Sequence, residues 1–503
     1  MTNAPLRLTG RDLTVTNVVA VARGGRPVEL DPDARSRMAA SRGVVERAVA
    51  SGDTIYGVTT GFGDLADVRI NAAQGTELQR NLVRSHAAGV DLPLDREVVR
   101  AMLLLRANAL AVGLSGVRPA VVDLLCGMLD AGVHPVIPSR GSVGASGDLA
   151  PLAHLALVVI GDGEAEVGGT VLPGAAALAS AGLAPLVLQA KEGLALLNGT
   201  QLMAGIGALA AADGQRLVAT ADLVGAMSLE ALEGTDAAFD EALIAARPHP
   251  GQIRSAARLR AALAGSEIGA NHRSSPHKVQ DPYSLRCMPQ VHGAVLDALA
   301  HLEGVLAVEM NSATDNPLVF PDGQVRSGGN FHGQPVALAL DHARLALTVL
   351  AAMSERRTAR ILDPRLSGLP PFLATQPGLE SGLMITQYTA AAIVNELQTL
   401  AHPTSAGSIP TSANQEDHVS MGAGAAHFLR RAADQVEWVL AVEAVCGAAG
   451  LDARLPHQPG AGVAAAYARI RANVPAHAGD RSPAPDLAAA RDLIHSGALA
   501  AED

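Results

Sequence analysis

The sequence predicts a mainly α-helical protein: an extended bundle of long helices with a small mixed α/β domain at the N-terminus. Of its 503 residues 49% are hydrophobic but only 2% are aromatic, so the core is built from Ala, Leu and Val, a mixture that favours helices. Apolar residues also recur at three- and four-residue spacing over stretches much longer than an average globular helix. These stretches are residues 97–129, 199–232, 291–308, 335–362, 382–401 and 425–447.

The N-terminal part of the chain follows a different pattern. Residues 1–110 combine helices and Gly-rich turns with two strand-like pieces, 13–21 and 54–58. We therefore expect two domains: a mixed domain over 1–110 that contributes to a functional site, and the long-helix bundle over 111–503. The motifs discussed below lie mostly at helix ends and in loops, where a rigid scaffold presents functional residues.

Bulk properties exclude several classes of function. A net charge of −11 without a cluster of Lys and Arg argues against a nucleic-acid-binding surface. The N-terminus lacks the apolar core of a signal peptide and no stretch reaches membrane-spanning length, so we expect a cytoplasmic protein. The widely separated Cys126, Cys287 and Cys446 fit reduced thiols rather than a disulfide framework. The 16 histidines show no metal-ligand spacing, so we expect no metal site.

The tripeptide Ala145-Ser146-Gly147 is the most informative local feature. If the Gly147 amide nitrogen attacks the Ala145 carbonyl carbon, the backbone closes to a five-membered ring. Loss of that carbonyl oxygen as one water and of the Ser146 hydroxyl as a second leaves an exocyclic methylidene. This group is an electrophile of a kind that no standard side chain supplies. Ala145 and Gly147 are small enough to let the backbone pinch together.

The same residues occur twice in the chain, so the tripeptide alone proves little. Residues 50–53 repeat the order Ala-Ser-Gly-Asp after an amphipathic stretch, which is typical of a helix end with Gly52 as its C-cap. The second copy follows the Pro- and Gly-containing segment 138–144 and precedes the apolar stretch 149–160, which predicts a helix with Asp148 as N-cap. A ring at a helix N-terminus would face the positive end of the dipole, which favours negative charge on its oxygen.

The run 141–154 resembles the prosthetic-group segment of the aromatic amino acid ammonia-lyases, and the wider match is to their histidine branch, the histidine ammonia-lyases. Further segments carry this resemblance along nearly the whole chain, in the family's order. They are Tyr56-Gly-Val-Thr-Thr-Gly-Phe-Gly63, Asn81-Leu-Val-Arg-Ser-His86, Leu196-Leu-Asn-Gly-Thr-Gln201, Val279-Gln-Asp-Pro-Tyr-Ser-Leu-Arg-Cys287, Asn311-Ser-Ala-Thr-Asp-Asn-Pro317, Gly329-Asn-Phe-His332 and Thr411-Ser-Ala-Asn-Gln-Glu-Asp-His-Val-Ser-Met421.

The resemblance implies a carbon–nitrogen lyase that converts L-histidine to trans-urocanate and ammonia in histidine catabolism. Because an amine is a poor leaving group and the β-hydrogen is weakly acidic, the reaction needs an electrophile and a base. The electrophile would be a methylidene-imidazolone (MIO) formed from Ala145, Ser146 and Gly147, with no external cofactor. The resemblance also implies a homotetramer with its core in the long-helix domain and with active sites that combine residues from three subunits.

Tyr283 is the residue that we expect to act as the base. Asp281-Pro282 is a helix-start signal with Asp281 as N-cap, which places Tyr283 and Arg286 on one face of a short helix. A neighbouring guanidinium favours the phenolate that a base needs, and the planar fork of Arg286 suits a substrate carboxylate. The ordinary alternatives are a packing tyrosine and a surface ion pair.

The resemblance assigns further residues to the pocket. Tyr56 belongs to a family motif and is a second catalytic candidate. The resemblance places Asn198 beside the ring and the substrate amine, and Phe331 in the lining of the pocket. Gln280 is a further, polar candidate for the pocket. Without the resemblance, Asn198 before a glycine would indicate a turn, Phe331 a core position and Gln280 an ordinary polar residue.

His86 and Glu416 decide the substrate. An imidazole ring needs hydrogen-bond partners, whereas a phenyl ring needs only apolar walls, and a carboxylate facing phenyl would be costly. Glu416 is typical of the histidine branch and is also a catalytic candidate; its ordinary alternative is a buried salt bridge. Four departures from the family pattern touch none of these groups: Gln334, Gly407, Asp91 and Gln398.

Two other functions stay open. One is a phenylalanine or tyrosine ammonia-lyase or aminomutase on the same scaffold, which products formed from histidine, phenylalanine and tyrosine would distinguish. The other is a helical binding protein that has lost the ring, against which the intact Ala145-Ser146-Gly147, Tyr283 and Arg286 argue. An intact mass two waters below the sequence mass would exclude the second.

Overall fold

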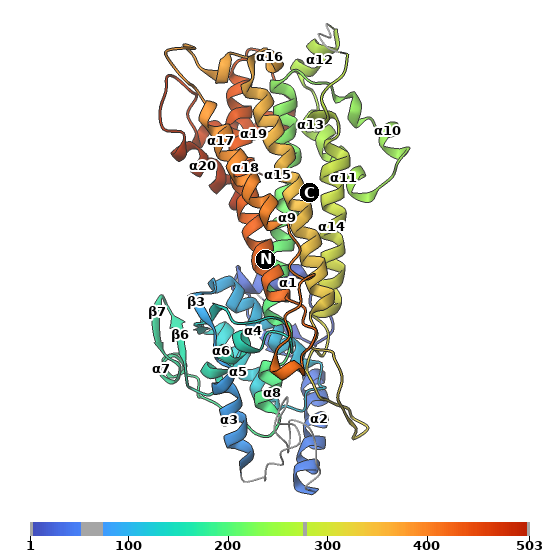
Figure 1. Cartoon of the computed structure of the whole chain (residues 1–503), viewed down its shortest axis with the longest axis vertical. Helices are drawn as coiled ribbons and strands as arrows, with labels where there is room; N and C mark the ends of the chain where they lie inside the picture. Colours follow the sequence, from blue (N-terminus) through green and yellow to red (C-terminus); the bar gives the residue numbers. More distant parts are fainter. Residues whose placement is uncertain (1–3, 52–73, 275–278, 500–503) are drawn as a thin grey trace. The chain divides into compact units, whose positions relative to one another are not determined.

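The computed structural model describes residues 4–51, 74–274 and 279–499, and over these residues the chain is mainly helical, as predicted (Figure 1). It divides into two compact units. The first comprises Met1–Ala212, Leu302–Asp341 and Pro403–His427, and the second comprises Asp213–His301, His342–His402 and Phe428–Asp503. The domain division at residue 110 that we expect from the sequence stays a prediction, because a compact unit need not be a separately folding domain.

The first unit combines helices with short strands. Its helices are α1 (Val15–Ala22), α2 (Pro32–Ser51), α3 (Gly75–His86), α4 (Arg96–Ala111), α5 (Pro119–Asp130), α6 (Leu149–Val159), α7 (Gly174–Ser180), α8 (Glu192–Leu197) and the 3₁₀ turn η5 (Ser412–Asn414). Its strands are β1 (Leu6–Leu8), β2 (Val28–Leu30), β3 (Val90–Pro93), β4 (His134–Pro135), β5 (Pro138–Arg140), β6 (Glu164–Val167), β7 (Thr170–Pro173), β8 (Leu318–Val319) and β9 (Val325–Arg326).

These strands form small separate sheets rather than one large one. β1 pairs with β2 in parallel, while β3 pairs with β5, β6 with both β4 and β7, and β8 with β9, all antiparallel. These sheets are too small to form a core of their own, so the helices supply the core of the unit. The antiparallel pair β3–β5 leads directly into the segment that contains Ala145.

Four long helices have residues in both units: α9 (Gln201–Ala231), α14 (Met288–Glu309), α15 (Gln334–Leu362) and α18 (Gly422–Asp452). All four agree with the predicted helical stretches to within a few residues. The other helices of the second unit are η3 (Asp236–Phe239), α10 (Glu241–Ala245), α11 (Pro250–Ala262), α12 (Glu267–Ser274), α13 (Tyr283–Arg286), α16 (Pro364–Ser367), η4 (Pro371–Leu373), α17 (Met384–Leu400), α19 (Ala461–Asn473) and α20 (Ala484–His495).

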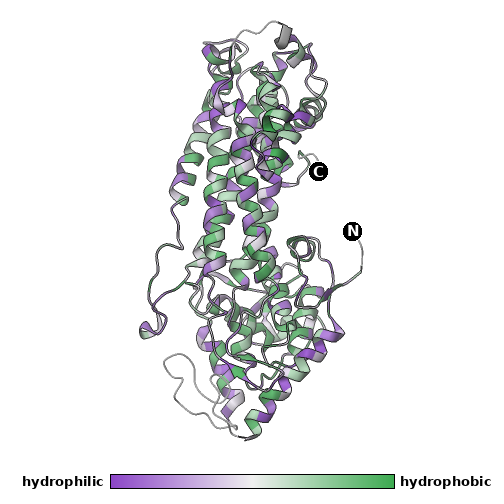
Figure 2. Cartoon of the chain, turned by 90° about the vertical axis from the view of Figure 1, so that its right-hand side faces the viewer, coloured by the Kyte–Doolittle hydropathy of each residue, from purple (hydrophilic) through white to green (hydrophobic). Residues whose placement is uncertain are grey.

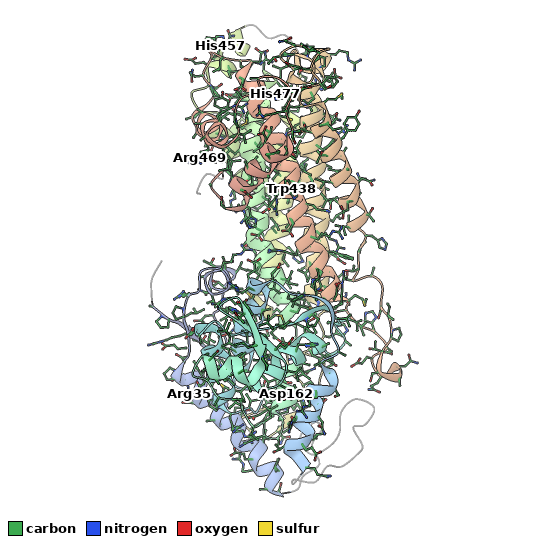
Figure 3. The ribbon with its side chains drawn as sticks, turned by 90° about the vertical axis from the view of Figure 1, so that its left-hand side faces the viewer. Arg35, Asp162, Trp438, His457, Arg469 and His477 are labelled. Atoms are coloured by element: carbon green, nitrogen blue, oxygen red, sulfur yellow. The ribbon has the colours of Figure 1, made fainter. Side chains whose placement is uncertain are left out.

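A buried polar cluster joins the long helices of the second unit. The Arg357 guanidinium binds both carboxylate oxygens of Glu443, at 2.5 and 2.8 Å, and donates to His292 Nε2 at 3.3 Å. His292 Nδ1 in turn donates to Asp222 at 2.8 Å. Because Arg357 can only donate, Nε2 of His292 is the acceptor and Nδ1 carries the hydrogen. In Figure 3 the labelled Trp438 lies on α18, and the Arg491 guanidinium of α20 lies 4.8 Å from its ring centroid.

From the sequence we expect no stretch of membrane-spanning length, and this expectation is wrong when helices are judged by their length and composition alone. Two helices, α14 and α15, are long and apolar enough to cross a membrane, and Figure 2 shows apolar residues along much of the long helices. Each nevertheless carries fully buried polar side chains, His292 on α14 and both Arg344 and Arg357 on α15. Since those groups pair with neighbouring helices, α14 and α15 are core helices of a bundle.

Two local predictions are wrong. Residues 13–21, expected to be strand-like, contain α1, whose start is fixed by a reciprocal capping box between Thr14 and Asn17. The stretch 97–129 is not one helix, because Gly113 and Gly116 take left-handed φ angles of +88° and +69° between α4 and α5. The predicted strand 54–58 lies outside the described residues.

Candidate active site

The Ala145-Ser146-Gly147 segment forms an irregular turn between β5 and α6. Gly147 has a φ of +76°, which an L side chain rarely adopts. A Cβ atom added to Gly147 would lie 2.2 Å from the Gly199 carbonyl oxygen, because the two glycines form a backbone bridge. The Asp148 amide donates to the same oxygen at 2.7 Å. Position 147 therefore requires glycine for its conformation and for this close approach.

Asn198 binds the backbone of this segment. It directly follows α8 and is 3% exposed, and its side-chain Nδ2 donates to the Ser146 carbonyl oxygen at 2.9 Å. A preorganised amide donor in a dry site stabilises negative charge that develops on the oxygen it binds. The structure thus brings Asn198 and Ser146 together, as the resemblance implies.

Glu416 binds the side chain of the same serine. The Ser146 hydroxyl donates to Glu416 Oε1 at 3.1 Å, and the Thr411 hydroxyl donates to Glu416 Oε2 at 2.7 Å. A backbone bridge between Thr411 and Glu416 closes the short loop that holds the carboxylate. Glu416 has no arginine or lysine partner among the described residues, so the ordinary alternative of a buried salt bridge is not realised there.

The Glu416 loop is fixed to the turn that contains Ser146. The Met421 amide donates to the Val143 carbonyl at 2.9 Å, and the Ser420 hydroxyl donates to the Gly144 carbonyl at 3.1 Å. Within the loop, Ser412, Ala413 and Asn414 all have positive φ angles, between 51° and 68°. Consecutive non-glycine residues in this region cost conformational energy, and such strain concentrates at functional sites.

Asp148 does not act as the sequence predicts. Helix α6 begins at Leu149 as expected, but the Asp148 side chain makes no cap hydrogen bond to it. Its Oδ2 instead accepts from the backbone amides of Leu202 and Met203, both at 3.0 Å, at the start of α9. Its Oδ1 accepts from Ser142 Oγ at 3.0 Å. Complete burial raises the pKa of Asp148 to about 6 although these hydrogen bonds oppose the shift.

His86 is the last residue of α3, a helix that packs against α6 and α8. Arg84 holds this helix end through a 2.7 Å bond to Asp162, which is labelled in Figure 3. The His86 Nδ1 lies 2.9 Å from the Leu82 carbonyl oxygen, which can only accept. Nδ1 therefore carries the hydrogen in the neutral ring, and Nε2 is left as an acceptor.

Phe331 is connected to the Glu416 loop through its neighbour. His332 Nε2 donates to the His418 carbonyl oxygen at 3.2 Å, and the two histidine rings stack with centroids 6.0 Å apart. Among the described residues, neither Phe331 nor His86 makes a hydrogen bond to Ser146, Asn198 or Glu416. Tyr56 lies outside the described residues.

The remaining predicted residues belong to the second unit. Tyr283 and Arg286 share one face of α13, with the Arg286 guanidinium carbon 4.6 Å from the centroid of the Tyr283 ring. The Tyr283 side chain is 70% exposed, which does not fit a packing tyrosine within this chain. Gln280 is also exposed. The predicted Asp281 cap is wrong, because that carboxylate accepts from the Thr235 amide at 2.7 Å and α13 has no side-chain cap.

Sequence reasoning missed the residues that hold these functional groups. Thr411 orients Glu416, Ser142 binds Asp148, and Arg106 donates to the Asn198 carbonyl oxygen at 2.8 Å. The first two lie in segments that resemble the family, so their neighbours could have indicated them. Arg106 lies in an apolar stretch of α4, where a charged residue at a buried position is itself a signal.

The cysteines and possible metal ligands add no further site. Cys126, Cys287 and Cys446 are free thiols, and burial raises the pKa of Cys126 and of Cys446 to about 12. Over the ranges that the structure describes, no three or more His, Cys, Asp or Glu side chains are grouped so that they could hold a metal ion.

Comparisons with known proteins identify the family of the chain. Residues 13–472 match the aromatic amino acid lyase family. The chain is 56% identical to the histidine ammonia-lyase of Anaeromyxobacter sp. (strain K), over 98% of this chain and 99% of that protein. The chain belongs to the aromatic amino acid lyase family. This membership confirms the predicted resemblance and the predicted class of enzyme, a carbon–nitrogen lyase.

Solved structures in the aromatic amino acid lyase family share the fold of the chain. Histidine ammonia-lyase from Trypanosoma cruzi matches with a TM-score of 0.91 and 40% identity, over 99% of this chain and 94% of that one. Tyrosine aminomutase from Streptomyces globisporus matches with a TM-score of 0.94 and 38% identity, over 99% and 98%. Since enzymes with differently named activities share the fold, the substrate has to be argued from the site.

Proposed function

We propose that this chain is a histidine ammonia-lyase, which converts L-histidine to trans-urocanate and ammonia. In this reaction the Cα–N bond and one Cβ–H bond break, a Cα=Cβ bond forms, the proton goes to a base and the amine leaves as ammonia. The identity of 56% to a relative named histidine ammonia-lyase supports this substrate. The observation that carries the proposal is the Glu416 carboxylate beside Ser146.

The prosthetic group that we propose is a methylidene-imidazolone made from Ala145, Ser146 and Gly147. The segment fits it, because Gly147 already has the left-handed backbone that a pinched turn needs and Ala145 is buried and small. The carbonyl oxygen of Ser146 would become the ring oxygen, and Asn198 already donates to it. When formed, this group supplies an electrophilic carbon that ordinary side chains lack.

In this proposal the residues of the second unit act on the other end of the substrate. Tyr283 removes the β-proton, and its exposed phenol beside the Arg286 guanidinium suits that role. Arg286 binds the substrate carboxylate: its buried Nε has no hydrogen-bond partner among the described residues. Tyr56 and Phe331 complete the pocket as the resemblance implies, and Gln280 is a further polar candidate.

We also propose a homotetramer whose active sites combine residues from three subunits. The exposure of Tyr283 supports this, since a large, rigid side chain that presents 70% of its surface is suited to meet a neighbouring subunit. A tetramer would bring a Tyr283–Arg286 pair from one subunit to the Ser146–Asn198–Glu416 cluster of another.

Glu416 and His86 would recognise the substrate imidazole. The Glu416 carboxylate can accept from a ring N–H, and the His86 Nε2 is an acceptor held in place by the Nδ1 bond to Leu82. A phenylalanine or tyrosine ammonia-lyase or aminomutase is the alternative on this scaffold. An uncompensated carboxylate against a phenyl ring would oppose phenylalanine, so Glu416 favours histidine.

The test replaces Glu416 by Gln, which keeps the shape of the side chain and removes its charge. We expect histidine turnover to fall by about two to three powers of ten, since losing the charged partner of a buried polar group costs ~2–5 kcal/mol. His86→Leu in the same background should then admit phenylalanine. The measurement is the initial rate of ultraviolet absorbance from histidine and from phenylalanine, with Asp417→Asn, an exposed neighbour, as control.

Two results would contradict the proposal. If wild type preferred phenylalanine or tyrosine, the substrate would be wrong while the family membership stood. If Glu416→Gln turned over histidine as fast as Asp417→Asn, the carboxylate would not recognise imidazole.

A further inference from the structure

Arg106 is a fully buried arginine that lies directly behind Asn198. It projects from α4 with 0% of its side chain exposed. Its Nη1 donates to the Asn198 carbonyl oxygen at 2.8 Å and to Gln201 Oε1 at 2.9 Å, and Gln201 Nε2 donates to Thr314 at 3.0 Å. The residue that donates to the Ser146 carbonyl is therefore itself fixed through its backbone by a cation.

Over the part of the chain that the structure describes, no carboxylate forms an ion pair with this guanidinium. The Asp315 carboxylate acts on Arg106 electrostatically, but it is already bound by Lys191 at 2.6 Å in a pair that is itself fully buried. Among the described residues, Arg106 Nε and Nη2 have no hydrogen-bond partner. Burial lowers the pKa of Arg106 to about 10, which still leaves it protonated at neutral pH. Burying a charge without a carboxylate partner destabilises a fold, and here the acceptors are only the Asn198 carbonyl and the Gln201 side-chain oxygen. This cost indicates a functional role for Arg106.

The backbone around Asn198 is shaped to receive this arginine. Gly199 has a φ of +155°, and a Cβ atom there would lie 2.5 Å from Arg106 Nη1 and 2.5 Å from Gln201 Oε1. The same Gly199 forms the bridge to Gly147. One guanidinium thus fixes the backbone segment around Gly199, which lies against the Ala145-Ser146-Gly147 turn.

We propose that Arg106 is a positioning residue for the reaction: it fixes the Asn198 backbone so that the Asn198 amide faces the Ser146 oxygen, and it places a positive charge behind that donor. The inference rests on the proposed function and adds a residue to it. Arg106 contacts no substrate, so it affects the rate through Asn198 and leaves substrate binding nearly unchanged.

Arg100 offers a matched control on the same helix. It is 8% exposed and, like Arg106, donates to backbone carbonyls, those of Val21 and Leu129. Those carbonyls belong to the packing of α1 and α5 and not to the Ser146 turn. Replacing either arginine by Met removes the same buried guanidinium group, but only Arg106 has Asn198 as its partner.

The experiment compares Arg106→Met, Arg106→Lys, Arg100→Met, Asn198→Ala and the double variant Arg106→Met/Asn198→Ala in the full-length protein. For each we measure kcat and KM, the apparent Tm, and the fraction of chains whose intact mass lies two waters below the sequence mass. Because a small misplacement at a reacting centre costs about 10²-fold, we expect kcat per ring-bearing chain to fall about 10²-fold in Arg106→Met with KM within a few-fold.

Three further results are expected. Arg106→Lys has a higher kcat than Arg106→Met because lysine keeps the positive charge, but a lower kcat than wild type because it lacks the planar guanidinium. Arg106→Met costs only a few-fold more once Asn198 is already Ala, since both act through one hydrogen bond. Arg100→Met lowers the Tm but leaves kcat per ring-bearing chain within a few-fold of wild type.

The opposite pattern would overturn the inference. If Arg106→Met lowered kcat no more than Arg100→Met, or by the same factor with and without Asn198, Arg106 would be a packing residue. Absence of the mass deficit in both Arg106 variants would show that Arg106 acts on ring formation instead. A wild-type chain without the mass deficit would overturn the proposed function itself, which is a separate outcome.

Discussion

The chain contains the order Ala-Ser-Gly-Asp twice, at 50–53 and at 145–148, and the two copies lie in different surroundings. Ser51 is the last residue of α2 and is exposed, and its hydroxyl donates to the Ala48 carbonyl three residues earlier at 3.1 Å. That bond is local and common at helix ends. The structure describes this copy only as far as Ser51.

The second copy makes contacts that are distant in sequence. The Ser146 carbonyl accepts from Asn198, 52 residues away, and the Ser146 hydroxyl donates to Glu416, 270 residues away. Ser146 therefore meets groups from distant segments of the chain, whereas the hydrogen bond of Ser51 to Ala48 lies within its own helix. A short motif is informative here only together with the segments that meet it in space.

The largest expected effect separates the two copies directly. In Ser146→Ala the hydroxyl that leaves as water is absent, so we expect a folded protein whose histidine turnover falls by on the order of 10³-fold or more, the scale of losing a covalent catalytic group. Ser51→Ala should keep turnover within a few-fold. Activity, intact mass and Tm of both variants provide the test.

Near-wild-type turnover by a folded Ser146→Ala protein would exclude the prosthetic group. Equal losses in both variants would mean that the two copies do not differ as their surroundings indicate.

Much of the fold was predictable from local patterns. The long helices α9, α14, α15, α17 and α18 follow from apolar spacing alone, and α6 begins at Leu149 as predicted. Two of the predictions that are wrong concern local structure. Thr14 and Asn17 form a capping box where we expect a strand, and Gly113 and Gly116 interrupt an otherwise continuous helical pattern.

The sequence indicates candidate residues for the site but not the contacts between them. Resemblance indicated Asn198 and Glu416 but could not give the contacts that hold them, because those depend on which loops meet in the folded chain. Asp148 shows the limit most clearly. Its position before α6 predicts an N-cap, yet its carboxylate binds the start of α9, 54 and 55 residues further along. Helix propensity is a local property, and the partner of a buried carboxylate is not.

A second prediction compares the glycines near the two copies. Gly147→Ala forces an L side chain to a φ of +76° and against the Gly199 carbonyl, so we expect the free energy of unfolding to fall by ~2 kcal/mol or more. Gly43→Ala, inside α2, meets only the flexible end of Arg47 at 3.4 Å and should raise it by ~0.5–1 kcal/mol. Both are made in the Ser146→Ala background, so that neither variant can form the ring.

The measurement is thermal unfolding at equal protein concentration, because in the proposed tetramer binding equilibria between subunits would shift the apparent Tm. We expect Gly147→Ala to lower the apparent Tm and Gly43→Ala to raise it. A Gly147→Ala protein as stable as its parent would show that the bridge to Gly199 does not constrain this turn.

The smallest effect concerns the pH dependence that Asp148 confers on stability. Burial raises the pKa of Asp148 to about 6, above the ~3.9 of an unfolded Asp. Between these two values the folded state holds the proton more tightly than the unfolded state does, so the stability that Asp148 contributes is fully present below about pH 4 and is lost as pH rises through about 6. Asp148→Asn keeps an acceptor for the Leu202 and Met203 amides and cannot ionise.

We therefore expect Asp148→Asn, again in the Ser146→Ala background, to show a smaller loss of Tm between pH 4.5 and 7.5 than its parent does. Glu230, whose pKa burial raises to about 7, contributes in the same direction in both proteins and leaves a residual slope. Asp91→Asn is the control: hydrogen bonds from the Leu92 amide and Arg140 lower the pKa of that exposed carboxylate, so removing it cannot reduce the loss of stability above pH 4. Parallel pH profiles for Asp148→Asn and its parent would mean that Asp148 stays ionised in the folded protein. In that case the hydrogen bonds of Asp148 to Ser142 and to the start of α9, which lower its pKa, would outweigh its burial, which raises the pKa. The second Ala-Ser-Gly-Asp copy would then end in a buried carboxylate that these hydrogen bonds stabilise.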